Sequence, residues 1–272
     1  GKIKGSKFIK RDGRPSDDAI LSGRIVDRTI RPLFNSRMRN EVQVVITVLS
    51  YDGENDPDVI AVIAASAALS ISDIPWAGPV GAVKIGKING GFVLNPVNGE
   101  QKESLLDLIL AGTQNKINMM EAGAKEVPEA EILEAFAFGF EAIKKITAFI
   151  EEIQKEVGKE KLAPALLQGP AEFEEKIKEL YKSEGLESAL YDKDKKVVQT
   201  KTEAIKEKIK TYIQENYTSK AESLEEVAEH IFEEIADETV HKNILEKELR
   251  PDGRKLDEIR PITCLTGILP RT

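Results

Sequence analysis

The residues best suited to chemistry form a basic stretch near the start of the chain, at residues 8–34 (FIKRDGRPSDDAILSGRIVDRTIRPLF). Between residues 1 and 40 there are eleven Lys and Arg against four Asp, a net charge of +7. The whole chain carries −8, so the remaining 232 residues carry −15. This asymmetry indicates a local anion-binding region on an otherwise acidic body, and it argues against a basic coat over the whole surface.

The loop at residues 5–16 places one aromatic ring beside several cations. Phe8 is followed by Lys10, Arg11 and Arg14. Unpaired bases stack on aromatic rings while Lys and Arg contact the phosphates, so this composition suits single-stranded nucleic acid. The alternative is an ordinary surface loop that Phe8 anchors to the core. Residue chemistry alone leaves these two interpretations even.

Three further arginines follow at helical spacing. Apolar residues recur with a helical period over residues 19–30, which places Arg24, Arg28 and Arg31 on one face of the predicted helix. A guanidinium presents a rigid fork of donors that matches phosphate oxygens. Like charges at this spacing repel each other, so a compensating anion is expected. We predict phosphate contacts, with an ion-pair network around Asp27 as the structural alternative.

The elements that must position these residues mix strands and helices. Residues 44–49 are a β-branched run that predicts a buried strand, and residues 58–72 predict a helix rich in small residues. Two hairpins are predicted, at residues 80–94 and 106–120. A long amphipathic helix at residues 128–157 follows them. This order indicates an α+β layer.

The second half of the chain has a different pattern. Pro164, Gly169 and Pro170 mark a boundary, after which only helical periodicity remains. We expect a small, acidic, all-helical domain whose charges are solvated helix faces. Its two histidines, His230 and His241, have no cysteine nearby and do not favour a metal site.

Long stretches of the sequence resemble bacterial polynucleotide phosphorylases. The first stretches are GSKFIKRDGRPSDDAILSGRIVDRTIRPLF, NEVQVVITVLSYD and NDPDVIAVIAASAALSISDIPWAGPVGAVKIG. The similarity continues through LDLILAGTQNKINMMEAGAKEVPEAEILEAFAFG and RPDGRKLDEIRPITCLTGILPRT, so it spans nearly the whole chain. At Thr29 the family usually has Pro, and this departure predicts a looser corner between Arg28 and Arg31.

The resemblance implies a fold and a division into domains. The implied fold class is α+β, a two-layer RNase PH-like core followed by a small all-α domain. Residues 1–158 would form the first core, without its N-terminal part, and residues 159–248 the helical linker domain. Residues 249–272 would begin a second RNase PH-like core. We therefore expect the chain to be a fragment of a longer protein.

The resemblance also implies a function. The family degrades single-stranded RNA processively from the 3′ end, with inorganic phosphate as co-substrate and nucleoside diphosphates as products. It acts in mRNA turnover in the cytoplasm as a ring-shaped homotrimer with RNA in a central channel. In this family the basic loop grips RNA, which carries over to Phe8, Lys10, Arg11 and Arg14. Arg24, Arg28 and Arg31 would support phosphate or the channel wall. A place in an RNA-degrading assembly stays open.

The family's active site lies in the second core, with its phosphate-binding Ser and Arg and its Mg²⁺-binding Asp and Lys. These positions would follow Thr272, so we expect no catalytic and no metal-binding residue in this chain. The alternative function is a non-catalytic RNA-binding or scaffold module with the same core fold. The single cysteine, Cys264, excludes a disulfide framework. The apolar runs are too short for a membrane span, and no signal peptide is evident.

Overall fold

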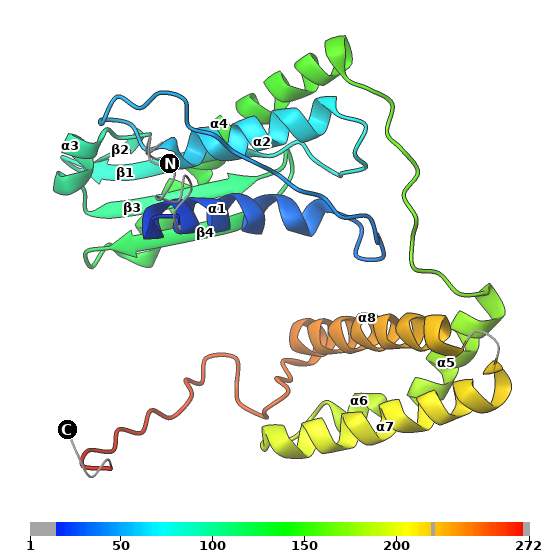
Figure 1. Cartoon of the computed structure of the whole chain (residues 1–272). Helices are drawn as coiled ribbons and strands as arrows, with labels where there is room; N and C mark the ends of the chain where they lie inside the picture. Colours follow the sequence, from blue (N-terminus) through cyan, green and yellow to red (C-terminus); the bar gives the residue numbers. More distant parts are fainter. Residues whose placement is uncertain (1–14, 219–220, 269–272) are drawn as a thin grey trace, which may run out of the picture. The chain divides into compact units, whose positions relative to one another are not determined.

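The computed structural model describes residues 15–218 and 221–268. The chain divides into two compact units, residues 1–165 and residues 166–272. In the part of the chain that the structure describes, the first unit combines a β-sheet with helices and the second is helical (Figure 1). Each unit has a hydrophobic core of its own.

The sheet of the first unit has four antiparallel strands in the order β2-β1-β3-β4. Both predicted hairpins are confirmed. The turn between β1 and β2 holds Asn89 and Gly90 at φ 51° and 81°, as a tight hairpin turn requires. The strands are β1 (Gly81–Ile88), β2 (Gly91–Leu94), β3 (Leu106–Gly112) and β4 (Ile117–Ala124).

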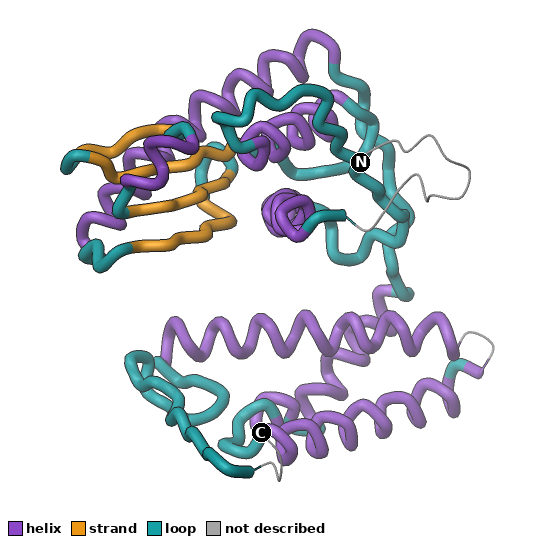
Figure 2. Tube along the Cα trace, turned by 60° about the vertical axis from the view of Figure 1, so that its left-hand side comes forward, coloured by secondary structure: helices purple, strands orange, loops and turns teal. Residues whose placement is uncertain are grey.

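Helices cover both faces of this sheet (Figure 2). Ala82 and Ile109 pack on one face against α1 (Asp17–Ile30) and α2 (Pro57–Ile71). The neighbouring strand residues point the other way, against α4 (Glu129–Val157), because side chains alternate along a strand. The predicted α+β class and its helices are confirmed. That helices lie on both faces is not evident from the order of the elements alone.

Two glycines allow α4 to approach the sheet closely: Gly139 on α4, and Gly81 on β1, where a Cβ atom would lie 3.1 Å from the Ile143 carbonyl oxygen. A Cβ atom at Gly139 would lie 2.4 Å from Ile85 Cδ1 and 3.2 Å from Leu110 Cδ2. A side chain at Gly139 would therefore displace Ile85 or push the helix away from the two central strands. The remaining short elements of this unit are the 3₁₀ turn η1 (Arg31–Leu33) and α3 (Asn98–Glu103).

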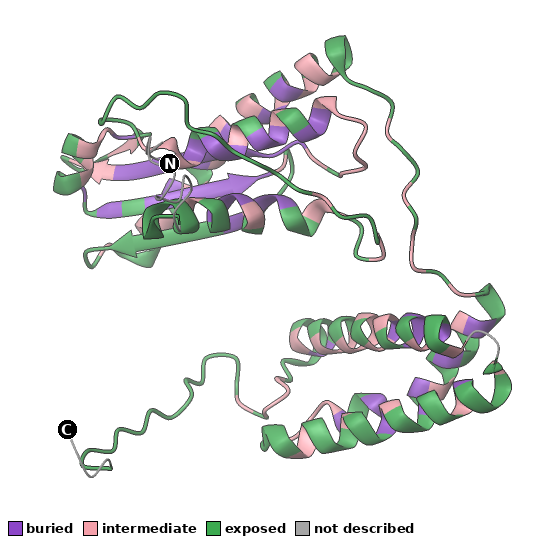
Figure 3. Cartoon of the chain, viewed as in Figure 1, coloured by how far each residue is buried: buried purple, intermediate pink, exposed green. Residues whose placement is uncertain are grey.

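The predicted strand at residues 44–49 is wrong. The chain there is extended but belongs to no sheet, and Val45 and Leu49 are 74% and 93% exposed (Figure 3). None of the described residues forms a backbone hydrogen bond with this run. β-Branched side chains favour an extended backbone, yet a strand also needs a neighbouring backbone to pair with.

The second unit packs its helices around one apolar core. α5 and α7 contribute Phe173, Ile177 and Ile209, and α8 contributes Ile231. Tyr181 is fully buried there and its hydroxyl donates to the Ala228 carbonyl at 3.1 Å. The helices are α5 (Ala171–Ser183), α6 (Leu186–Ala189), α7 (Lys195–Asn216) and α8 (Ala221–Lys247). The long helices match the sequence prediction. Within the described residues, no helix is long and apolar enough to cross a membrane.

A lysine closes the C-terminal end of α2. Lys161, which follows α4, donates from Nζ to the carbonyls of Leu69, Ser70 and Ser72 at 2.7, 3.0 and 2.7 Å. Desolvation lowers the pKa of this ammonium group. The last carbonyls of a helix have no partner within the helix, so a cation there satisfies both their hydrogen bonding and the helix dipole.

Replacing Lys161 tests this cap. We expect Lys161→Met to lower the free energy of unfolding by about 1–3 kcal/mol, because hydrogen bonds from a charged donor are lost. Urea unfolding followed by circular dichroism measures the change. The matched control is Lys159→Met, since Lys159 contributes only its backbone N–H, to the Ile71 carbonyl at 3.0 Å. Equal losses in the two variants would contradict the cap.

The exposed β-branched run generates a second prediction. We expect Val45→Lys/Leu49→Lys to leave the free energy of unfolding unchanged, because neither side chain is buried. Self-association should fall, since charges on an unpaired extended segment oppose pairing with another copy. Light scattering over a range of protein concentrations measures this. A clear loss of stability would show that the run packs against the unit after all.

Candidate nucleic-acid interface

α1 is the element that positions the three described arginines. Ser16 starts the helix, because its side-chain oxygen accepts a hydrogen bond from the Ala19 N–H at 3.2 Å. Asp17 and Asp18 follow in the first turn, where the helix dipole favours acids. One face of the helix is buried on the sheet, and Arg24, Arg28 and Arg31 lie on the exposed side.

The end of α1 is held firmly. Trp76 Nε1 donates to the Ile30 carbonyl at 3.0 Å. Thr29 is fully buried; its hydroxyl donates to the Ile25 carbonyl at 2.8 Å. The Thr29 carbonyl accepts from Asn118 Nδ2 at 2.9 Å. The looser corner predicted from Thr29 is therefore not observed, because the side chain and carbonyl both find partners.

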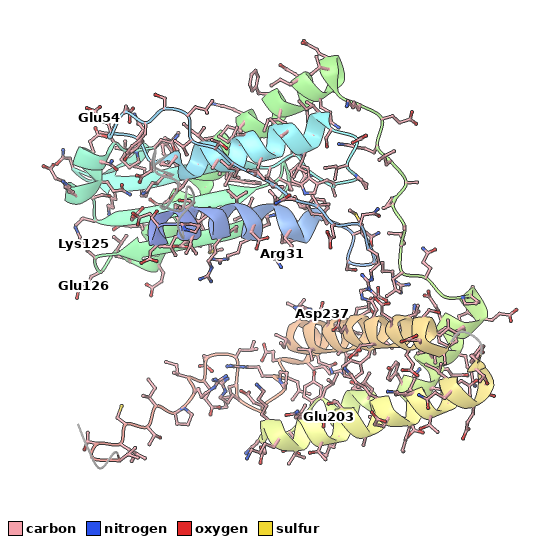
Figure 4. All side chains as sticks on the ribbon, in the orientation of Figure 1. Arg31, Glu54, Lys125, Glu126, Glu203 and Asp237 are labelled. Atoms are coloured by element: carbon pink, nitrogen blue, oxygen red, sulfur yellow. The ribbon has the colours of Figure 1, made fainter. Side chains whose placement is uncertain are left out.

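The three arginines differ in their partners. Figure 4 shows Arg31 near the end of α1. Two donors of its guanidinium contact the Asp27 carboxylate, and this interaction raises the pKa of Arg31. Arg28 Nη1 lies 3.3 Å from Glu121 Oε2 on β4. The Arg24 side chain is exposed and makes no hydrogen bond or ion pair with any described residue. The ion-pair alternative thus accounts for Arg28 and Arg31, and it leaves Arg24 as an available cation.

A cleft of about 1050 Å³ lies beside α1, but its chemistry does not suit phosphate. Its walls are the inner side of α1, the start of α2 and the extended run at residues 42–51. Four carboxylates line it and Arg31 is the one Lys or Arg among its lining residues. Arg24 and Arg28 do not line it. An anionic ligand would therefore contact the outer side of α1 rather than this cleft. Its acidic lining residues are Asp18, Asp27, Asp56 and Asp58.

Four of the predicted RNA contacts, Phe8, Lys10, Arg11 and Arg14, lie outside the described residues. The structure places the other three on one exposed helix face. Across residues 15–218 and 221–268, no three His, Cys, Asp or Glu side chains converge as a metal site would require. The described residues therefore offer no carboxylate cluster that fits Mg²⁺.

Comparison with known families assigns most of the sequence. Residues 2–75 match the model described as 3′ exoribonuclease family, domain 1. Residues 78–142 match domain 2 of the same family. Residues 172–255 match the model described as polyribonucleotide nucleotidyltransferase, RNA binding domain.

Individual relatives match along the whole chain. Polyribonucleotide nucleotidyltransferase of Streptococcus equi subsp. equi is 45% identical over 274 residues, which cover all of this chain and 38% of the relative. The Bacillus cytotoxicus protein of the same name is 44% identical over 272 residues, with the same coverage. The chain belongs to the polyribonucleotide nucleotidyltransferase family. It spans a little over a third of the length of these relatives.

One solved structure gives a weaker likeness. The chain is similar to rice Rrp46 at 14% identity and a TM-score of 0.42, over 53% of this chain and 69% of that chain. The identity and the score are too low to support an argument about function.

The polyribonucleotide nucleotidyltransferase match adds a region that sequence reasoning passed over. The family model with RNA binding in its description covers the helical unit, where we expected only solvated helix faces. The missed signal is the uneven distribution of lysines among these helices, since α7 holds six Lys against three Glu while α8 holds nine acids against two Lys.

The partners of the arginines can be tested through stability. A double-mutant cycle on Arg28→Gln and Glu121→Gln should give a coupling free energy of about 0.2–1 kcal/mol, as expected for an exposed ion pair. Arg24→Gln should leave the free energy of unfolding unchanged, because its side chain has no described partner. Thermal unfolding measures both. Destabilisation by Arg24→Gln would indicate that Arg24 is structural.

Proposed function

We propose that this chain is part of a phosphorolytic 3′-to-5′ exoribonuclease that degrades single-stranded RNA in mRNA turnover. The observation that carries the proposal is the 45% identity to polyribonucleotide nucleotidyltransferases over the whole chain. In the proposed reaction an oxygen of inorganic phosphate attacks the phosphorus of the last phosphodiester. The bond to the 3′ oxygen of the preceding nucleotide breaks, which releases a nucleoside diphosphate and leaves RNA with a new 3′ hydroxyl.

Both reactants are anions, so the RNA must be held by cations while phosphate approaches it. We assign this task in the first unit to the basic N-terminal segment. Phe8 would stack on a base, and Lys10, Arg11 and Arg14 would contact phosphates. Arg24 would extend the contact along α1. Arg28 and Arg31 keep exposed donors, but their carboxylate partners reduce the local positive charge.

The proposal extends to the division of the chain into domains and to the assembly of the complete protein. Residues 1–158 would form the first RNase PH-like core, residues 159–248 the helical linker and residues 249–272 the start of a second core. The second core would supply the catalytic groups and the Mg²⁺ site. The complete protein would be a cytoplasmic homotrimer around an RNA channel. The RNA-binding name of the family model over residues 172–255 supports RNA as the partner.

RNA binding over a salt series tests the N-terminal contact. We expect Lys10→Ala/Arg11→Ala to bind a short single-stranded RNA more weakly and with a smaller salt dependence. Two lost phosphate contacts should reduce the slope of log K against log salt by about 1.4. Arg24→Ala should reduce it by about half as much. Fluorescence anisotropy with a labelled oligonucleotide measures both.

The matched control removes the same charge elsewhere in the first unit, with Lys155→Ala/Lys159→Ala. Both residues are exposed, near the end of α4. Equal slopes for all variants would rule out an RNA contact by the basic segment. A protein that joins this chain to a second core but releases no nucleoside diphosphate from RNA and phosphate would favour the scaffold alternative.

A further inference from the structure

The helical unit gathers several segments at one of its ends, where α7 begins and α8 finishes (Figure 1). Asn243 Nδ2 on α8 donates to Glu187 Oε1 on α6 at 3.0 Å. A Cβ atom at Gly253 would lie 3.7 Å from Lys193 Cε, so the loop after α8 reaches the start of α7. We call residues 187–201 and 242–255 the basic end.

The charge of the basic end opposes that of the unit around it. The basic end has nine Lys and Arg against six Asp and Glu, a net charge of +3. Residues 166–272 as a whole have eighteen Lys and Arg against twenty-four Asp and Glu, a net charge of −6. The rest of the helical unit therefore carries −9. A positive region bounded by negative surface attracts an anionic partner to that region alone.

Four of the six acids of the basic end accept hydrogen bonds within it: Glu187, Asp192, Asp194 and Asp252. Glu187 accepts from Asn243, Asp192 from the backbone of Asp194, and Asp252 from Arg254; these hydrogen bonds are the main reason that the pKa of each carboxyl lies below its usual value. Asp192 also pairs with Lys201 at 3.1 Å. These carboxylates stay ionised, but their oxygens are directed at partners of their own.

The lysines at and just before the start of α7 have no such partner. The side chains of Lys193, Lys195 and Lys196 are exposed and form no hydrogen bond or ion pair with any described residue. Lys195 and Lys196 occupy the first turn of α7, which contains no acid. Cations are unfavourable at that end of a helix because of its dipole. A local conflict of this kind is typical of a surface that serves binding rather than helix stability.

We propose that Lys193, Lys195 and Lys196 contact the phosphates of single-stranded RNA, as a second RNA-binding surface of this chain. The inference rests on the proposed function, which supplies the RNA. Lysine ammonium groups act as point charges, so they contact phosphate oxygens without reading the base sequence. All three lie inside the region that matches the RNA-binding family model.

The test compares two triple variants of the whole chain in binding to a labelled oligouridine. Lys193→Gln/Lys195→Gln/Lys196→Gln removes the proposed contacts. Lys178→Gln/Lys182→Gln/Lys208→Gln removes equal charge from α5 and from α7 beyond the basic end. We expect the first variant to bind ~10–100-fold more weakly at 0.1 M salt, with a slope smaller by about 2. The control should bind as the wild type does.

Thermal unfolding accompanies the binding measurement. We expect the first variant to melt at or above the wild-type temperature, because it removes two cations from the first turn of α7. If it melts lower, crosslinking of wild-type chain to 4-thiouridine RNA decides instead. Crosslinks within residues 193–196 would support the proposal, and their absence would overturn it.

The outcomes separate this inference from the proposed function. If the first triple variant binds RNA with wild-type affinity and Lys10→Ala/Arg11→Ala binds it more weakly, the proposed contact at the basic end is overturned and the N-terminal contact is supported. If only the first triple variant loses affinity for RNA, the contact at the basic end is supported and the N-terminal contact is overturned. If both triple variants lose affinity equally, the RNA is held by general electrostatic attraction, and the proposed contact at the basic end is overturned. Failure of the wild-type chain to bind RNA at any salt would overturn both.

Discussion

Burial of the two central strands on both faces is the constraint on which the first unit depends. Nearly every residue of β1 and β3 is buried, so the sheet needs an apolar layer on each side. α4 supplies one layer, and the absence of a side chain at Gly139 lets it approach closely. α1 and α2 supply the other. The position of α1 follows from this packing, and the outward direction of its arginines follows in turn.

Hydrogen bonds from other elements then fix the C-terminal turns of α1 and α2. Trp76 and Asn118 hold the last turn of α1, and Lys161 holds the last turn of α2. These contacts join residues far apart in the sequence. The exposed arginine face of α1 is therefore carried on a rigid support, which would reduce the entropy lost in the RNA contact that we propose there.

The basic side chains of this protein differ in whether an acidic side chain lies close enough to form an ion pair with them. Arg28 and Arg31 are as basic in sequence as Arg24, yet carboxylates of β4 and α1 reach only the first two. In the helical unit the lysines in the second half of α7 pair with acids of α8 and with Glu184, which follows α5, whereas the lysines at the start of α7 form no such pairs. Both units thus present cations that the fold itself does not neutralise, and phosphate is the anion that they share in our proposal.

The sequence by itself determined the α+β class, both hairpins and the long helices, because local periodicity and turn residues carry that information. It also indicated the family, through long stretches of similar sequence. It also located the basic segment, since charge density is a property of composition. Only the tertiary structure decided which arginine is available, because Glu121 lies 93 residues from Arg28. The run at residues 44–49 also shows that the sequence does not reveal long-range partners. Its side chains favour a strand, but a strand forms only where another backbone pairs with it, and no local pattern contains that partner.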